Sequence, residues 1–151
     1  MAVEVVIFVG LPAAGKTTFY QQRFAATHVH ISKDLWPKSA DKNARQAREL
    51  KGALASGRSV VVDNTNPTVA DRALVIHSAG EHGARIVGYY FVAEPREAIG
   101  RNRGREGKAR VPNVAIFTAA KRMVIPTRSE GFDELYRVTV AGDGGFDVEP
   151  V

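Results

Sequence analysis

The chain has 151 residues, of which 44% are hydrophobic and 25% are charged, and this predicts one ordinary globular domain over residues 1–151. It contains no cysteine, which excludes disulfides and thiol chemistry, and no apolar run long enough for a signal peptide or a membrane span, so we expect a cytoplasmic protein. The formal net charge of +5 suits a polyanionic partner.

Hydrophobic patterns along the first half of the chain predict strands that alternate with helices. A β-branched run at residues 3–9 is typical of a strand buried on both faces, and a helix follows from about 16 to 25. A short strand at 28–31 precedes a helix at 40–56, whose alanine and leucine side chains fall on one side. We expect Gly57 to end this helix.

The same alternation continues in the second half. A buried strand at 59–64 leads into a helix for which Asn66 is the expected N-cap and Pro67 the first residue. This helix should end near Gly83, and a fourth strand follows at 84–92.

The remaining elements complete the fold prediction. They are a helix that starts at Pro95 and runs toward Arg101, a helix at 113–124, a last strand at 135–140 and a flexible tail at 142–151. Strands joined by helical crossovers predict an α/β fold, with a parallel sheet sandwiched by helices. Ligands of such folds bind beyond the carboxyl ends of the strands, so the residues that follow each strand are the candidate site.

The loop after the first strand reads GLPAAGKTT and fits the pattern G-x-x-x-x-G-K-[ST]. Its glycines let backbone N–H groups surround phosphate oxygens, Lys16 would reach the β- and γ-phosphates, and the Thr17 hydroxyl would bind Mg²⁺. The alternative is a glycine-rich turn with a surface lysine, but the position between a strand and a helix favours a P-loop. The expected nucleotide-binding residues are Gly10, Ala13, Ala14, Gly15, Lys16, Thr17 and Thr18.

A carboxylate follows each of the next two strands. Asp34 could accept the proton of an attacking hydroxyl during phosphoryl transfer, or it could only cap a turn. Asp63 ends an apolar run as in a Walker B segment, where it would hold Mg²⁺ directly or through water, or it could only shape the turn with Asn64. His28 and His30 lack metal-ligand spacing with acidic partners, and their even spacing favours one face of a strand.

The segment RNRGREGKARVP, residues 101–112, follows the fourth strand and its helix. It lies in a basic region, because residues 95–128 hold nine Lys or Arg against two Glu, a net charge of +7. The arginines able to form bidentate contacts with phosphate are Arg96, Arg101, Arg103, Arg105 and Arg110. The segment is either a solvated basic loop or a mobile lid that brings arginines to a transferred phosphoryl group.

Five stretches taken together resemble a known family: GLPAAGKTTF, ISKD, VVVDNTNP, RNRGREGKARVP and PTRSEGFDELYRV. They occur in the order seen in 5′-hydroxyl polynucleotide kinases, including the kinase domain of polynucleotide kinase-phosphatases, and span roughly residues 5–140. The resemblance implies a P-loop kinase fold with an arginine-rich lid. It also implies transfer of the γ-phosphate of ATP or another NTP to the 5′-OH end of RNA or DNA, with Mg²⁺ or Mn²⁺ as cofactor.

The resemblance assigns roles to the residues that match the family pattern. Lys16 and Thr17 match the P-loop lysine and the metal-binding hydroxyl, and Asp34 matches the general base that activates the 5′-OH. Arg101 and Arg105 match the lid arginines that grip the NTP phosphates.

The sequence departs from the family pattern at two places. Phage-type members place an arginine shortly after the catalytic Asp to hold an acceptor phosphate, whereas this chain reads LWPK, so either Lys38 substitutes or acceptor binding differs. The lid is one residue longer before VP, which leaves the choice between Arg103 and Arg105 at the γ-phosphate open. The expected acceptor-binding residues are Asp34, Lys38, Asp63 and Arg103.

Two other functions use the same features. One is a P-loop kinase that acts on the hydroxyl of a nucleoside, a sugar or an antibiotic, and the other is a nucleotide-dependent binding module that needs no acceptor. Because a phosphatase, ligase or phosphodiesterase domain does not fit in 151 residues, we expect a stand-alone kinase module. The acceptor sugar and the oligomeric state are left open by these patterns.

Overall fold

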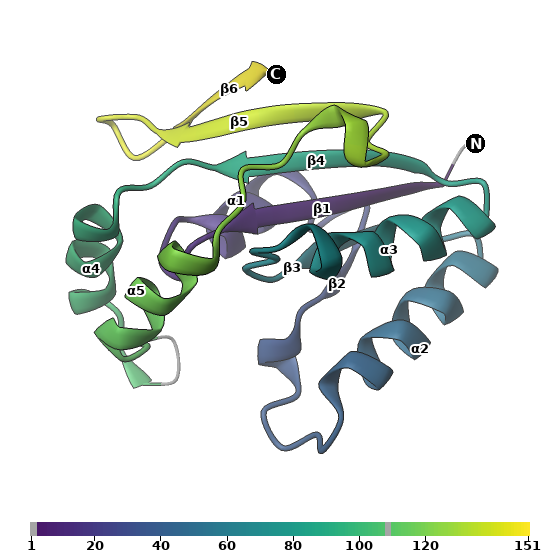
Figure 1. Cartoon of the computed structure of the whole chain (residues 1–151), viewed down its shortest axis with the longest axis horizontal. Helices are drawn as coiled ribbons and strands as arrows, with labels where there is room; N and C mark the ends of the chain where they lie inside the picture. Colours follow the sequence, from purple (N-terminus) through teal and green to yellow (C-terminus); the bar gives the residue numbers. More distant parts are fainter. Residues whose placement is uncertain (1–2, 108–109) are drawn as a thin grey trace.

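The computed structural model describes residues 3–107 and 110–151, which are built around one six-stranded sheet (Figure 1). The strands are β1 Glu4–Gly10, β2 Val29–Ile31, β3 Val60–Asp63, β4 Arg85–Phe91, β5 Glu134–Val140 and β6 Phe146–Pro150. Their order across the sheet is β2-β3-β1-β4-β5-β6. Neighbours from β2 to β5 pair in parallel, and β6 pairs antiparallel with β5. The predicted α/β fold with a mostly parallel sheet is confirmed.

Helices pack on both faces of this sheet (Figure 1). They are α1 Lys16–Arg23, α2 Lys42–Ala55, α3 Val69–Glu81, α4 Pro95–Arg103 and α5 Asn113–Arg122, with short 3₁₀ turns η1 Lys33–Leu35 and η3 Arg128–Glu130. Apolar side chains of α2 and α3 form one core layer, and those of α1, α4 and α5 belong to the other. In the part of the chain that the structure describes, no helix combines the length and apolarity needed to cross a membrane.

The central strand β1 separates the two core layers. Val5, Ile7 and Val9 face the layer of α2 and α3, whereas Val6 and Phe8 face the layer of α1. This alternation follows from the pleat of a strand, in which successive side chains point to opposite faces. All five side chains are fully buried, which explains why the sequence shows a continuous apolar run there.

The predicted start of the helix after β3 is wrong by two residues. Thr68 is the N-cap of α3, and its hydroxyl and the Asp71 carboxylate form a reciprocal capping box. Asn66 instead adopts a left-handed φ of 46° and donates its side-chain amide to the Phe8 carbonyl at 2.8 Å. Because Asn tolerates this conformation and its amide is buried against β1, it anchors the loop after β3 rather than capping the helix.

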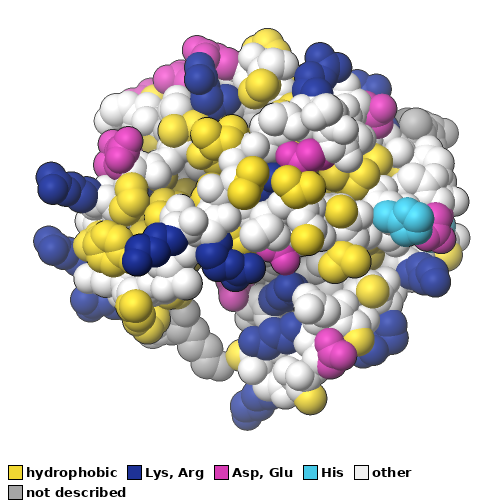
Figure 2. All heavy atoms as spheres, in the orientation of Figure 1, with side chains coloured by type: hydrophobic (Ala, Val, Ile, Leu, Met, Phe, Trp, Pro, Cys, Tyr) yellow, Lys and Arg dark blue, Asp and Glu magenta, His cyan; other side chains and the backbone are white. Residues whose placement is uncertain are grey.

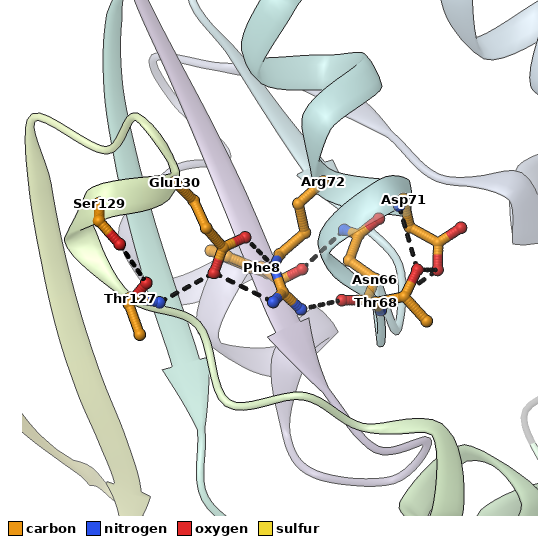
Figure 3. Close-up of polar contacts among 8 residues, drawn as sticks. All are labelled: Phe8, Asn66, Thr68, Asp71, Arg72, Thr127, Ser129 and Glu130. Carbon is orange, nitrogen blue, oxygen red and sulfur yellow. Dashed lines mark hydrogen bonds and ion pairs between the residues drawn. The ribbon is translucent and has the colours of Figure 1, made fainter.

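A buried ion pair holds the same loop in place (Figure 3). Arg72 of α3 is fully buried, and its guanidinium donates to both carboxylate oxygens of Glu130, at 2.8 and 3.1 Å. Its Nη1 also donates to the Asn66 carbonyl at 2.9 Å, and Glu130 accepts from the Thr127 backbone N–H at 2.9 Å. One network therefore joins the loop after β3 to the segment that leads into β5.

Replacing Arg72 by Met is expected to lower the free energy of unfolding by about 3–5 kcal/mol, because it leaves the Glu130 carboxylate buried without its cation. The double replacement R72M/E130L should recover part of this loss, since neither charge then remains buried. Chemical denaturation measures both changes, with the exposed Arg48→Met as the matched control. An R72M protein as stable as the R48M protein would contradict this reading of the network.

The expected tail at 142–151 is corrected by the structure, because Phe146–Pro150 forms strand β6 along β5. Its first residue carries a Phe146 ring that packs edge-on against Phe19 of α1, with ring centroids 5.1 Å apart. The segment alternates only Phe146 and Val148 with polar residues, which is a weak strand pattern in isolation. Antiparallel pairing with β5, its neighbour in the chain, and contact with α1 at the other end of the chain stabilise it.

Candidate active site

A cleft of about 300 Å³ lies beyond the carboxyl ends of β1 and β3 and brings together most of the predicted residues, but not Gly10, Ala14, Lys38 and Arg103. Its lining is Pro12, Ala13, Gly15, Lys16, Thr17, Thr18, Asp34, Asp63, Asn64, Thr65, Arg101, Arg105 and Val111. Figure 2 shows the surface hollowed between the α4–α5 side and the part over η1 and the start of α2, where Lys and Arg side chains gather. The cleft therefore has the position at which open parallel sheets bind ligands.

The P-loop between β1 and α1 has the shape of an anion-binding loop. Ala13 and Gly15 have left-handed φ values of 63° and 94°, which turn successive backbone N–H groups toward a common side. Gly15 is also restricted by space, since a Cβ there would lie 3.1 Å from the Phe146 ring of β6. α1 begins directly afterwards at Lys16, so its N-terminal N–H groups face the same region.

The Lys16 side chain is buried in this loop. Its Nζ donates to the carbonyls of Gly10 at 2.9 Å and Leu11 at 2.7 Å. Burial lowers the pKa of Lys16 from 10.5 to about 8, although the carboxylates of Asp63 and Asp34 act in the opposite direction. A bound triphosphate adds negative charge beside the ammonium group and so is expected to raise this pKa again.

ATP binding should therefore become weaker as the pH rises above about 8, the range in which free Lys16 loses its proton. Binding at about pH 9 must then take up a proton, whereas binding at about pH 6.5 finds Lys16 already charged. Calorimetry of ATP binding in two buffers of different ionisation enthalpy measures this proton uptake. The K16R variant should not take up the proton at about pH 9, because its guanidinium stays charged. Equal proton uptake at both pH values would contradict the prediction.

Thr17 and Asp63 place two side-chain oxygens next to each other in the lining of the cleft. The Thr17 hydroxyl donates to Oδ2 of Asp63 at 2.9 Å, and the Asp63 side chain is buried at the end of β3. Mg²⁺ prefers oxygen ligands and commonly uses only one or two protein groups, together with substrate phosphates and water. The residues present therefore fit the cation that the sequence predicts.

His30 belongs to this site, although the sequence patterns do not assign it there. Its Nε2 lies 2.8 Å from Oδ2 of Asp63, and its ring stacks on Tyr20 of α1 with centroids 4.1 Å apart. The partners are 33 residues apart in the chain, and only the parallel pairing of β2 with β3 brings them together. The sequence predicted only that His28 and His30 share one face of a strand. Their spacing gives no indication that His30 contacts Asp63.

Asp34 lies in η1 at the edge of the cleft, with its residue exposed to solvent. The alternative reading as a turn cap does not describe it, because Ser32 is the N-cap of η1 and accepts from the Asp34 backbone N–H at 3.3 Å. Asp34 and Asp63 line the same cleft as Lys16. The two carboxylates thus lie beside a phosphate-binding loop, as a general base and a metal ligand require.

The basic segment, residues 101–112, begins inside α4 and folds back on itself. The buried Asn102 side chain donates to the Val111 carbonyl and accepts from the Val111 backbone N–H at 2.9 Å, which closes the intervening loop. Arg101 donates to the carbonyl of Ala13 in the P-loop at 3.3 Å. This end of the segment therefore contacts the predicted nucleotide site directly.

The arginines of this segment differ in whether they line the cleft. Arg101 and Arg105 line the cleft, whereas Arg103 is exposed and does not. Nη1 of Arg105 is buried and has no hydrogen-bond partner among residues 3–107 and 110–151. Lys38 is exposed and does not line the cleft, and Lys108 lies outside the described residues. The geometry favours Arg105 over Arg103 as the arginine that meets a phosphate.

Comparisons with known proteins point to the same family as the sequence motifs. A family model described as an AAA domain matches residues 5–124. A bifunctional polynucleotide phosphatase/kinase of Schizosaccharomyces pombe is 30% identical over 139 residues, which cover 89% of this chain and 33% of that protein. A protein of Acanthamoeba polyphaga mimivirus, which carries the same name provisionally, is 30% identical over 143 residues. These residues cover 90% of this chain and 33% of that protein. The chain thus spans about a third of the length of these relatives.

Solved structures show the same fold in several kinases. A protein of Chloroflexus aurantiacus, provisionally named a kinase, has a TM-score of 0.73 at 18% identity and covers 97% of this chain and 90% of its own. A fungal RNA kinase has a TM-score of 0.68 at 13% identity, covering 91% and 76%. A gluconokinase of Sinorhizobium meliloti has a TM-score of 0.64 at 19% identity, covering 91% and 83%. The resemblance predicted from the sequence is confirmed, and the chain belongs to the AAA domain family, with the fold of P-loop kinases and with polynucleotide phosphatase/kinases among its relatives.

Proposed function

We propose that the chain is an ATP-dependent phosphotransferase that transfers the γ-phosphate of ATP or another NTP to the 5′-hydroxyl end of RNA or DNA. One observation carries the proposal: the P-loop, two carboxylates and two arginines line a single cleft. The names of the two curated relatives favour a polynucleotide as the acceptor. A 5′-phosphate end is what strand joining consumes, so this activity suits nucleic acid repair.

The charged residues of the cleft each have a place in this reaction. The P-loop N–H groups and Lys16 bind the β- and γ-phosphates, and Asp34 accepts the proton of the 5′-hydroxyl as its oxygen bonds to the γ-phosphorus. The bond from that phosphorus to the bridging oxygen breaks, and the nucleoside diphosphate leaves. Arg101 and Arg105 offset the negative charge of the transferred group. Mg²⁺ or Mn²⁺, held at Thr17 and Asp63 when bound, supplies further charge neutralisation.

The acceptor strand is proposed to bind the basic surface beside the cleft. Lys38 and Arg103 are exposed, as contacts to a phosphate backbone require, and their role in acceptor binding stays a prediction. Because such contacts release condensed counterions, the affinity for a single strand should fall with salt by about 0.7 in log–log slope for each phosphate neutralised. Titrations with a labelled 5′-OH oligonucleotide at several salt concentrations measure this slope.

Transfer of label from γ-labelled ATP tests the proposal directly. We expect labelling of 5′-OH RNA or DNA oligonucleotides, and no labelling of the same oligonucleotides that already carry a 5′-phosphate. The second candidate is a kinase of a small-molecule hydroxyl, since the fold is shared with a gluconokinase. Free nucleosides and gluconate therefore belong in the same assay. Equal activity on nucleosides, or no activity on any oligonucleotide, would overturn the polynucleotide assignment.

A further inference from the structure

We propose that Asn64 is a positioning residue that holds the turn carrying Asp34 against the cleft, and this inference rests on the proposed function. Asn64 follows Asp63 at the end of β3 and lines the cleft. Its Oδ1 accepts from the Lys33 backbone N–H at 2.9 Å, and its Nδ2 donates to Oε1 of Gln46 at 2.7 Å. A single amide therefore joins β3, η1 and α2.

The orientation of this amide follows from its partners. The Lys33 backbone N–H can only donate, so the Asn64 oxygen must face it and the Asn64 nitrogen must face Gln46. Gln46 is buried, at 9% exposure, and a buried amide is costly to leave without a hydrogen bond. Both ends of the Asn64 side chain are thus occupied, and the side chain is held in one orientation.

The turn η1 follows β2 through the buried Ser32, and the hydrogen bond from the Lys33 N–H to Asn64 ties it to the end of β3 as well. Its local hydrogen bonds, from Leu35 N to Ser32 O at 3.0 Å and from Trp36 N to Lys33 O at 3.1 Å, shape the turn but do not position it. Trp36 is buried in the core on the C-terminal side of Asp34. Asn64 anchors the N-terminal side through a contact that spans 31 residues of sequence. Asp34 therefore lies between two anchors, and Asn64 is the polar one.

This arrangement predicts an effect on the chemical step rather than on ATP binding. Asp34 directly follows the residue whose N–H the Asn64 side chain holds, and a misplacement of about 1 Å can cost about 10²-fold in rate. The hydrogen bonds of Asn64 do not involve the P-loop. We expect Asn64→Ala to lower kcat for 5′-OH oligonucleotides about 10- to 100-fold. The dissociation constant for ATP should stay within about 2-fold.

Two variants separate positioning from general damage. Asn64→Asp keeps an oxygen acceptor for the Lys33 N–H, and the Gln46 amide can rotate to donate to it, so the turn should stay in place; because the added charge lies beside Asp63 in the cleft, hydrogen exchange rather than kcat is the readout for this variant. Asn43→Ala is the matched control, because Asn43 is exposed in α2. In a D34N background, N64A should cause no further loss, because Asn64 acts through Asp34. A structural defect would lower the rate in both backgrounds by the same factor.

Hydrogen exchange gives a readout that does not depend on catalysis. N64A should speed the exchange of the backbone amides of residues 33–35 and leave β4 unchanged, whereas N43A should leave both unchanged. Unchanged exchange in the turn, wild-type kcat in N64A, or an equal loss in the D34N background would each overturn the inference. A wild-type protein that labels no 5′-OH end would instead refute the proposed function, and the exchange result would still decide whether Asn64 holds the turn.

Discussion

Replacing Arg105 by Ala is expected to lower the rate of phosphoryl transfer by about 10³- to 10⁵-fold, the range for one arginine that stabilises a transferred phosphoryl group. Its guanidinium lies in the wall of the cleft, and the buried Nη1 has no hydrogen-bond partner in the described chain. A buried donor without a partner is costly, so an anion that supplies the missing acceptor is bound favourably. The proposed γ-phosphate provides such an acceptor.

The experiment compares kcat for R105A, R105K and R103A at saturating ATP and 5′-OH oligonucleotide. R105K keeps the charge but loses the bidentate fork, so its rate should lie between those of the wild type and R105A. Arg103 is exposed and does not line the cleft, so R103A should affect acceptor binding more than the chemical step. A larger loss of kcat in R103A than in R105A would reverse the assignment.

Replacing Asp34 by Asn is expected to lower kcat by about 10²- to 10⁴-fold, the usual contribution of a general base. The change preserves shape and removes the proton acceptor, while the P-loop residues that bind the nucleotide are untouched. ATP binding should therefore persist, and single-turnover transfer to a 5′-OH oligonucleotide should be slow. The exposed Asp147→Asn in β6 is the matched control.

The same variant distinguishes an enzyme from a nucleotide-dependent binding module. In such a module no acceptor takes part, so D34N would leave ATP turnover intact and an oligonucleotide would not stimulate release of ADP. Near-normal transfer in D34N would remove Asp34 from the role of base. The cleft would then need another proton acceptor, and the next groups to test are Asp63, which lines the cleft, and His30, which hydrogen-bonds to it.

The nucleotide half of the site could be predicted because its residues are consecutive. Gly10 to Thr17 run from the last residue of β1 through the connecting loop into the first turn of α1, and the glycine spacing alone indicates how the backbone must turn. The placement of Asp34 and Asp63 in the site could also be predicted from the sequence, because parallel strands bring their carboxyl ends to one edge of the sheet. Their position in the cleft agrees with that reasoning.

Errors arose where a local pattern competed with a tertiary contact. Asn66 is a residue type that commonly caps helices. Here its side-chain amide donates to the Phe8 carbonyl of β1 and its own carbonyl accepts from Arg72, so Thr68 caps the helix instead. The C-terminal residues looked like a tail because only two apolar side chains alternate there, yet pairing with β5 makes a strand. Asn66 is drawn to β1, 58 residues away, and β6 is stabilised by its hairpin with β5 and by the contact of Phe146 with Phe19, so tertiary contacts outweighed the local propensity.

The sequence by itself determined the alternation of strands and helices, the P-loop and the two carboxylates that follow β2 and β3. Only the tertiary structure decided which arginine meets the cleft, that His30 contacts Asp63, and that Asn64 bonds to both Lys33 and Gln46. The physical reason is the order of the strands. Placing β3 between β2 and β1 brings Asp63 to His30 and Asn64 to the Lys33 backbone N–H, contacts that span 33 and 31 residues, and no periodicity within one element records such a distance.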